Sequence, residues 1–171
     1  MHIATKSSKI DITLEKDTKS ISQKISKFLL NGDIIFLYGE IGVGKTTFVR
    51  HLINHLQVKF NLKKTEVQSP TFNLLHEYQI KKLNIQHYDL YRVKNNLELK
   101  NIGLFENSKE SIIFVEWPEI IKNKPKNRIE FIFNYIFLTY SKVLVSTIIV
   151  SSLSINGGTC IFKPLSNIAG L

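Results

Sequence analysis

The stretch Gly39-Glu40-Ile41-Gly42-Val43-Gly44-Lys45-Thr46 decides how this chain folds. It fits the pattern G-x-x-x-x-G-K-[ST], a glycine-rich loop that binds phosphate groups. The apolar, β-prone run 33–38 precedes it, and the run 47–56 follows it with apolar residues at helical spacing. A strand, a glycine loop and a helix in this order are the context in which the pattern forms a site. A glycine-rich turn without a ligand is the weaker interpretation.

The chemistry of this loop follows from its residue types. Glycines adopt positive φ, so the backbone bends around a phosphate and points several N–H groups inward. The helix start adds unpaired N–H groups and the positive end of a dipole. The Lys45 ammonium can reach β- and γ-phosphates, and the Thr46 hydroxyl can bind Mg²⁺. The residues expected to bind a nucleotide here are Gly39, Glu40, Gly42, Val43, Gly44, Lys45, Thr46 and Thr47.

Length and composition predict one soluble, globular domain. The chain has 171 residues, of which 43% are hydrophobic and 22% charged. We expect the domain to span residues 1–150 and the patternless residues 151–171 to form a tail. A single cysteine excludes an internal disulfide and is typical of a reducing cytoplasm. The uncharged run 143–162 is long enough for a membrane span, but its serines, glycine pair and β-branched residues argue against one.

The formal net charge of +9 raises the question of nucleic-acid binding. The lysines are scattered, and the denser groups at 63–64, 81–82 and 122–128 fall in expected loops or helix ends. A solvated basic surface is therefore favoured over a specific RNA patch.

Hydrophobic periodicity predicts the remaining elements. Residues 10–14 alternate as a strand, and a helix is expected to follow with Asp17 or Thr18 as N-cap and to end at Asn31-Gly32. The later expectations are a hairpin of 73–79 and 83–89, a short helix over 97–106 capped at Gly103, a buried strand over 111–115, and paired strands over 128–138 and 142–150. The sequence thus predicts an α/β fold of the P-loop NTPase type, with a mainly parallel sheet flanked by helices and an antiparallel hairpin.

Nucleotide hydrolysis needs a carboxylate for the metal and a group that orients the attacking water. Glu116 ends an apolar strand, the usual position of a metal-binding acid beside a phosphate loop. Asp89 ends the second hairpin strand and is expected to orient water or cap a turn. Thr71 lies on a loop stiffened by Pro70, where a nucleotide-sensing switch would be placed.

Several short motifs also occur in a fixed order. They are Gly32-Asp33, residues 39–50, Ser69-Pro70-Thr71-Phe72, His76-Glu77-Tyr78, His87-Tyr88-Asp89-Leu90-Tyr91-Arg92, Gly103-Leu104 and Glu116-Trp117-Pro118-Glu119. With these motifs the chain resembles the TsaE (YjeE-type) family, small bacterial P-loop ATPases required for threonylcarbamoyladenosine (t6A) modification of tRNA. The combination S-P-T-F, H-x-D-L-Y-R and E-W-P-E is specific, whereas a P-loop alone is common.

The resemblance implies a protein that binds ATP and Mg²⁺ and hydrolyses ATP weakly alone. Its expected partners are the threonylcarbamoyl-transferring subunit and that subunit's inactive paralogue, through which it would act on adenosine 37 of tRNA indirectly, in the cytoplasm and without a membrane. By the same resemblance Lys45, Asp89 and Glu116 are catalytic, and Thr46 and Glu116 bind Mg²⁺. Thr71 would lie in a switch-like loop and Thr18 near the nucleotide.

The resemblance also has limits. Glu40 stands where Asp is commoner, residues 135–150 lack the Arg usual in the last strand, and residues 151–171 are unmatched.

Two other functions fit parts of the sequence. A small-molecule kinase of the nucleoside or shikimate type would share the phosphate loop, but it usually needs an arginine-bearing lid. The chain has only Arg50, Arg92 and Arg128, which are widely separated. A non-enzymatic RNA-binding module would fit the charge, but the sequence lacks interleaved aromatic and basic stacking motifs.

Overall fold

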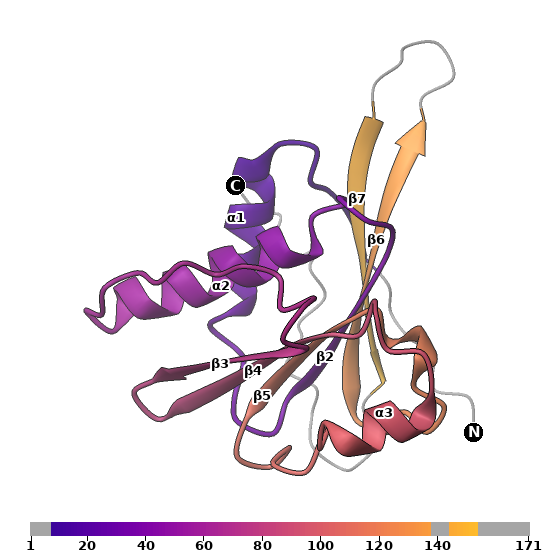
Figure 1. Ribbon diagram of the computed structural model, residues 1–171. Coiled ribbons are helices and arrows are strands. Elements are labelled where there is room, and N and C mark those ends of the chain that lie inside the picture. Colours follow the sequence, from indigo (N-terminus) through magenta and orange to yellow (C-terminus); the bar gives the residue numbers. More distant parts are fainter. Residues whose placement is uncertain (1–7, 138–143, 154–171) are drawn as a thin grey trace.

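The computed structural model describes residues 8–137 and 144–153 of the chain (Figure 1). Within these residues the strands form one seven-stranded sheet in the order β1-β7-β6-β2-β5-β4-β3. The strands are β1 Ser8–Asp11, β2 Ile34–Tyr38, β3 Leu75–Ile80, β4 Leu83–Asp89, β5 Ile112–Glu116, β6 Arg128–Phe137 and β7 Leu144–Leu153. The helices are α1 Glu15–Ile25, α2 Lys45–Lys59, α3 Asn96–Asn101 and the 3-10 turn η1 Pro118–Ile120.

The centre of the sheet is parallel and the two edges are antiparallel. Strand β2 lies between β5 and β6, and β5 lies between β2 and β4, all in parallel pairs. Strand β5 is buried along its whole length and β2 up to its last residue, as expected for apolar strands covered on both faces. The expected α/β class with a parallel core and an antiparallel hairpin is confirmed.

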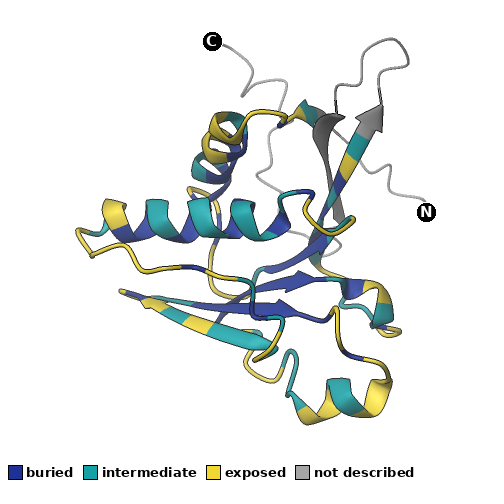
Figure 2. Ribbon diagram, turned by 45° about the horizontal axis from the view of Figure 1, so that its top comes forward, coloured by how far each residue is buried: buried dark blue, intermediate teal, exposed yellow. Residues whose placement is uncertain are grey.

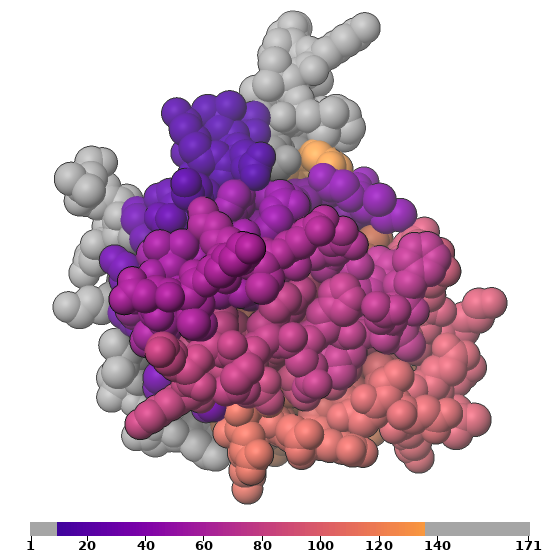
Figure 3. All heavy atoms as spheres, turned by 60° about the vertical axis from the view of Figure 1, so that its left-hand side comes forward, coloured from indigo at the N-terminus to yellow at the C-terminus, as the bar shows by residue number. Residues whose placement is uncertain are grey.

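Helices cover both faces of this sheet. Helices α1 and α2 lie on one face over a core that includes Ile35, Leu37 and Phe114, and α3 lies on the other (Figure 1). Figure 2 shows that the side of α2 facing the sheet is buried, whereas its outer side is partly exposed. The segment after α2 returns along the hairpin, and in Figure 3 the two form one continuous surface. Val67 anchors that segment in the core.

Both expected hairpins form. Strands β3 and β4 pair in antiparallel fashion around a turn at Lys81, whose φ of 55° is left-handed. Strands β6 and β7 pair over ten residues, and their connection lies outside the described residues. Strand β7 continues to Leu153, and β1 pairs with its outer edge.

The N-terminal expectations were wrong in detail. The first strand occupies residues 8–11 instead of 10–14, and α1 begins at Glu15, so that neither Asp17 nor Thr18 is its N-cap. The cap is Leu14, which makes no side-chain hydrogen bond. The helix ends at Ile25, before the expected Asn31-Gly32, because the chain turns to bury Leu29. No helix among residues 8–137 and 144–153 combines the length and apolarity needed to cross a bilayer.

Candidate functional site

The glycine loop connects the end of β2 to the start of α2. Gly39, Gly42 and Gly44 have φ values of 132°, 79° and 109°, which disfavour any residue with a Cβ atom. A Cβ on Gly39 would also overlap the carbonyl oxygen of Phe133 on β6. Gly44 is the N-cap of α2, so the first N–H groups of the helix have no side-chain cap. Such a helix start is suited to bind an anion.

Lys45 is the first residue of α2, and its side chain folds back over the loop. Its Nζ donates hydrogen bonds to the carbonyl oxygens of Gly39 and Glu40, the latter at 2.9 Å. It also lies 4.0 Å from the centroid of the Trp117 ring. Burial lowers the pKa of Lys45, and the negative charge of Glu116 partly opposes this effect. A buried ammonium held only by carbonyls and a ring has a strong affinity for an incoming anion.

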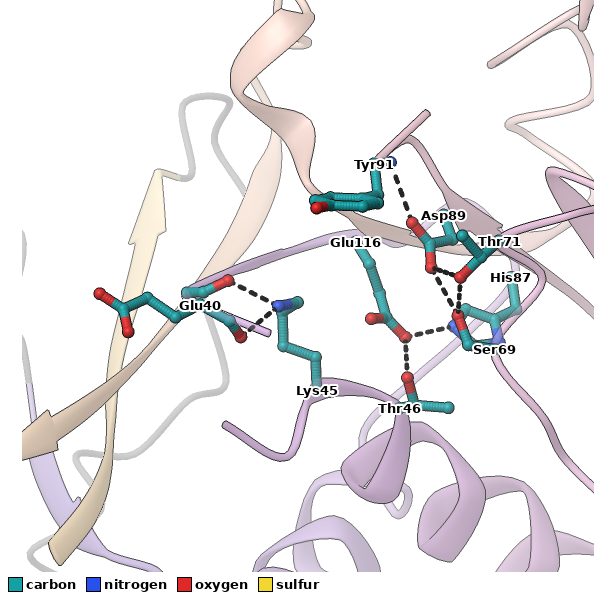
Figure 4. Close-up of polar contacts among 10 residues, drawn as sticks. Glu40, Lys45, Thr46, Ser69, Thr71, His87, Asp89, Tyr91 and Glu116 are labelled. Atoms are coloured by element: carbon teal, nitrogen blue, oxygen red, sulfur yellow. Dashed lines mark hydrogen bonds and ion pairs between the residues drawn. The ribbon is translucent and has the colours of Figure 1, made fainter. Parts of the chain in front are cut away.

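Glu116 reaches the next residue of the helix. Its Oε1 accepts a hydrogen bond of 2.8 Å from the Thr46 hydroxyl and one of 2.9 Å from His87 Nε2 (Figure 4). The carboxylate is 4% exposed. Glu116 is the last residue of β5, where it pairs in register with Asp89 on β4 and Leu37 on β2. The carboxyl ends of three parallel strands therefore bring these side chains to the start of α2.

Asp89 is buried and binds the loop that precedes the hairpin. Its Oδ2 accepts hydrogen bonds from the hydroxyls of Ser69 and Thr71, and its Oδ1 accepts one of 2.9 Å from the backbone N–H of Tyr91. The two hydroxyl oxygens also lie 2.7 Å apart, and because each hydroxyl has a single proton, both are oriented by donating to Asp89. The Asp89 carboxylate thus connects the Ser69–Thr71 loop with the chain after β4, as Figure 4 shows.

These groups surround one cavity of about 350 Å³. Of the residues expected to bind nucleotide or catalyse hydrolysis, those that line it are Gly42, Gly44, Lys45, Thr46, Thr47, Thr71, Asp89 and Glu116. Glu40 is an exposed residue of the loop, and Val43 packs into the core. Thr18 is buried within α1 and is not among the lining residues.

Sequence reasoning missed four residues around this cavity. Ile41, Ser69 and Tyr91 line it, and His87 lies behind it against Glu116. Alternation along the strand was an available signal for His87, because it shares a face of β4 with Asp89 two residues later. Trp117 also lines the cavity, where its ring lies beside Lys45.

The donors present fit Mg²⁺ better than a transition metal. Thr46 and Glu116 offer a hydroxyl and a carboxylate oxygen 2.8 Å apart. Within the described part of the chain, no group of three or more His, Cys, Asp or Glu side chains could hold a metal by itself. Mg²⁺ commonly takes one or two protein oxygens and completes its shell with phosphates and water.

The three arginines have other partners, although Arg50 Nη2 also donates a hydrogen bond of 3.3 Å to the hydroxyl of Thr47 at the edge of this cavity. Arg50 pairs with Glu15 at 3.5 Å, Arg128 pairs with Glu130 at 2.7 Å, and Arg92 stacks on the Phe72 ring. None of the three is among the lining residues.

Comparison with known proteins agrees with the motifs. Residues 12–138 match the family model described as threonylcarbamoyl adenosine biosynthesis protein TsaE. The tRNA threonylcarbamoyladenosine biosynthesis protein TsaE of Rickettsia prowazekii is 42% identical over 109 residues, which are 64% of this chain and 73% of that protein. The protein of the same name from Bacillus subtilis is 31% identical over 119 residues, covering 68% and 71%.

A solved structure supports the fold independently. The crystal structure of Bacillus subtilis YdiB superimposes with a TM-score of 0.68 at 22% identity, and the match covers 90% of each chain. The family model spans most of the chain, including the glycine loop, Asp89 and Glu116. This chain therefore belongs to the TsaE family of threonylcarbamoyl adenosine biosynthesis proteins.

Proposed function

We propose that this protein is the Mg²⁺-dependent, ATP-hydrolysing subunit required for t6A modification of tRNA at adenosine 37. It acts on the heterodimer of the threonylcarbamoyl-transferring subunit and its inactive paralogue. Family membership supports the place in t6A biosynthesis. The observation that carries the ATPase assignment is the meeting of Lys45, Thr46, Asp89 and Glu116 at one cavity beside the glycine loop.

The loop and Lys45 bind the phosphates in this proposal. The backbone N–H groups from Gly42 to Thr46 surround the phosphate oxygens at the start of α2. The Lys45 ammonium leaves the carbonyls of Gly39 and Glu40 and offsets the negative charge on the β- and γ-oxygens. The adjacent Trp117 ring keeps this ammonium on the cavity side of the loop.

The oxygens of Thr46 and Glu116 would hold Mg²⁺, with the other ligands coming from phosphate and water. Bound Mg²⁺ supplies Lewis-acid stabilisation of the charge that develops on the transferred phosphoryl group. Asp89 lines the same cavity and would help place the attacking water, and Thr71 lies beside it on the switch-like loop.

The two alternative functions receive less support. A kinase lid would need arginines over the phosphates, whereas Arg50 and Arg128 pair with glutamates and Arg92 stacks on an exposed phenylalanine. None of the three arginines is among the residues that line the cavity. The function of a non-enzymatic RNA-binding module does not explain why a buried lysine and two buried carboxylates meet at one cavity.

Exposed apolar side chains around the cavity support the docking part of the proposal. Ile41 and Tyr91 line the cavity and are exposed, and Phe72 follows Thr71 directly. A partner that covers these residues would contact the nucleotide-sensing loop itself. Exposed apolar groups beside a site are typical of protein-binding surfaces.

The direct test is ATP turnover with and without the two partner subunits. We expect weak turnover alone and at least about tenfold stimulation in the complex, since placing catalytic groups contributes roughly 10²-fold or more. EDTA, Lys45→Ala and Glu116→Ala should each abolish turnover, and Lys45→Ala should abolish ATP binding. The controls Lys59→Ala and Glu110→Ala remove the same charges from the exposed surface and should leave turnover unchanged.

Two results would contradict this proposal. Full stimulated turnover in Glu116→Ala would remove the metal assignment. Absence of stimulation by both partners together would remove the docking assignment. ATP-dependent phosphorylation of a free metabolite would instead support the kinase alternative.

A further inference from the structure

His87 lies directly behind the proposed metal-binding carboxylate. Its side chain is fully buried, and its Nε2 is 2.9 Å from Glu116 Oε1, the oxygen that also accepts the Thr46 hydroxyl (Figure 4). The register explains this position. His87 pairs with Phe114 on the neighbouring parallel strand, and Glu116 comes two residues later on the same face.

The surroundings of the imidazole define its tautomer. A carboxylate oxygen only accepts, so the hydrogen bond to Glu116 requires a proton on Nε2. Nδ1 is buried and has no hydrogen-bond partner within the described residues. The geometry therefore makes Nε2–H a fixed donor aimed at Glu116.

This donor helps to set the orientation of the Glu116 carboxylate toward the cavity. Both side-chain hydrogen bonds that Glu116 makes within the described residues reach Oε1, one from each side. Without His87, only the Thr46 hydroxyl would orient the carboxylate, and that hydroxyl is itself a proposed Mg²⁺ ligand. Outer partners of metal-binding carboxylates commonly fix their orientation in this way.

We propose that His87 is a positioning residue that holds the Glu116 carboxylate in its cation-binding orientation through the Nε2–H···Oε1 hydrogen bond. This inference rests on the proposed function, because it assumes that Glu116 binds Mg²⁺. It assigns to His87 a role in cation affinity and none in nucleotide binding, since the imidazole does not line the cavity.

The experiment compares two substitutions of similar size in the full chain. His87→Leu removes the donor, whereas His87→Gln keeps an N–H close to the place of Nε2. His76→Leu is the matched control, because His76 lies opposite His87 on β3 and bonds Asn73 instead of a site residue. Affinity for Mn²⁺ is measured in the presence of ADP by electron paramagnetic resonance. Affinity for ADP in EDTA is measured by the fluorescence of Trp117, the single tryptophan of the sequence.

We expect His87→Leu to weaken Mn²⁺ binding by about 10- to 100-fold while ADP affinity in EDTA stays at the wild-type value. His87→Gln should recover most of the Mn²⁺ affinity, and His76→Leu should match the wild type. A folded His87→Leu protein with wild-type Mn²⁺ affinity would overturn the inference. An equal loss of Mn²⁺ affinity in His87→Leu and His87→Gln would also overturn it, because the effect would then come from the packing of the side chain instead of its hydrogen bond to Glu116.

Two further results remain decisive. If the wild-type protein binds ADP but no Mn²⁺, or neither, the proposed function fails before His87 is considered. If His87→Leu does not fold, long-range ¹⁵N–¹H couplings of the wild-type imidazole decide the question. A proton on Nε2 is expected, and an imidazole without a proton on Nε2 would overturn the inference.

Discussion

At the scale of single residues, the loop of residues 39–46 needs glycine for two different reasons. Gly44 has a φ of 109° but open space around the place of a Cβ, so an alanine there meets only backbone strain. Gly39 has a φ of 132°, and a Cβ there would also overlap the carbonyl oxygen of Phe133. Because that oxygen belongs to the backbone of β6, it cannot move aside without disturbing the sheet.

These two glycines give a paired stability prediction. Gly44→Ala should reduce the free energy of unfolding by about 1 to 2 kcal/mol, the usual cost of a left-handed residue. Gly39→Ala should cost at least about 3 kcal/mol, because overpacking adds to the same strain. Urea unfolding followed by circular dichroism measures both. Equal costs for the two variants would show that the contact with Phe133 is unimportant.

At the scale of elements, Asp89 joins two loops. Its two oxygens accept three hydrogen bonds, from the Ser69 and Thr71 hydroxyls and from the N–H of Tyr91. If Thr71 turns to contact a γ-phosphate, it must give up its bond to Asp89. The loop of residues 69–74 therefore has two competing partners for one hydroxyl, which is a suitable basis for a switch.

This arrangement predicts that Asp89 holds the loop in addition to any role toward water. Asp89→Ala should increase amide hydrogen exchange over residues 69–74 in the nucleotide-free protein, because two hydroxyls lose their acceptor. Exchange in β5 should stay unchanged. Thr71→Ala removes one of the bonds and should give a smaller increase in the same segment. If exchange over 69–74 is unaffected by Asp89→Ala, the aspartate acts on water alone.

Sequence patterns predicted the central elements well and the first helix poorly. Strands β2 and β5 are short, continuous apolar runs. This pattern is typical of parallel strands that are covered on both faces. For α1, hydrophobic periodicity predicted a helix that continues to Asn31-Gly32. The helix instead ends at Ile25, and the following turn exposes Phe28 while it buries Leu29. Tertiary packing decided that ending, and local periodicity does not record it.

At the scale of the whole molecule, topology accounts for the predictable part of the site. Parallel neighbours bring Asp89 and Glu116 to one edge, so their meeting with Lys45 and Thr46 followed from strand ends alone. The hydrogen-bond partners of these two carboxylates did not follow from the strand ends. Whether Ser69 bonds Asp89, or His87 bonds Glu116, depends on strand register and side-chain rotamers over 20 to 29 residues of separation.

The same scale gives the last prediction, which concerns docking. Phe72 is 81% exposed beside the switch loop, with Arg92 stacked 4.0 Å from its ring. Leu97 is 68% exposed on α3, on the face of the sheet opposite α1 and α2. A partner that contacts the loop of residues 69–74 must cover Phe72, whereas Leu97 lies outside that loop. Phe72→Ala should therefore reduce stimulated ATP turnover, and Leu97→Ala should not.

The size of the effect separates docking from catalysis. Truncating a central aromatic contact commonly costs 2 kcal/mol or more of binding free energy, so the affinity for the heterodimer should fall roughly 30-fold. Turnover of the isolated subunit should stay the same, because Phe72 does not line the cavity. Binding is measured by calorimetry and turnover by phosphate release. A loss of basal turnover without a loss of affinity for the heterodimer would show that Phe72 contributes to catalysis instead of docking.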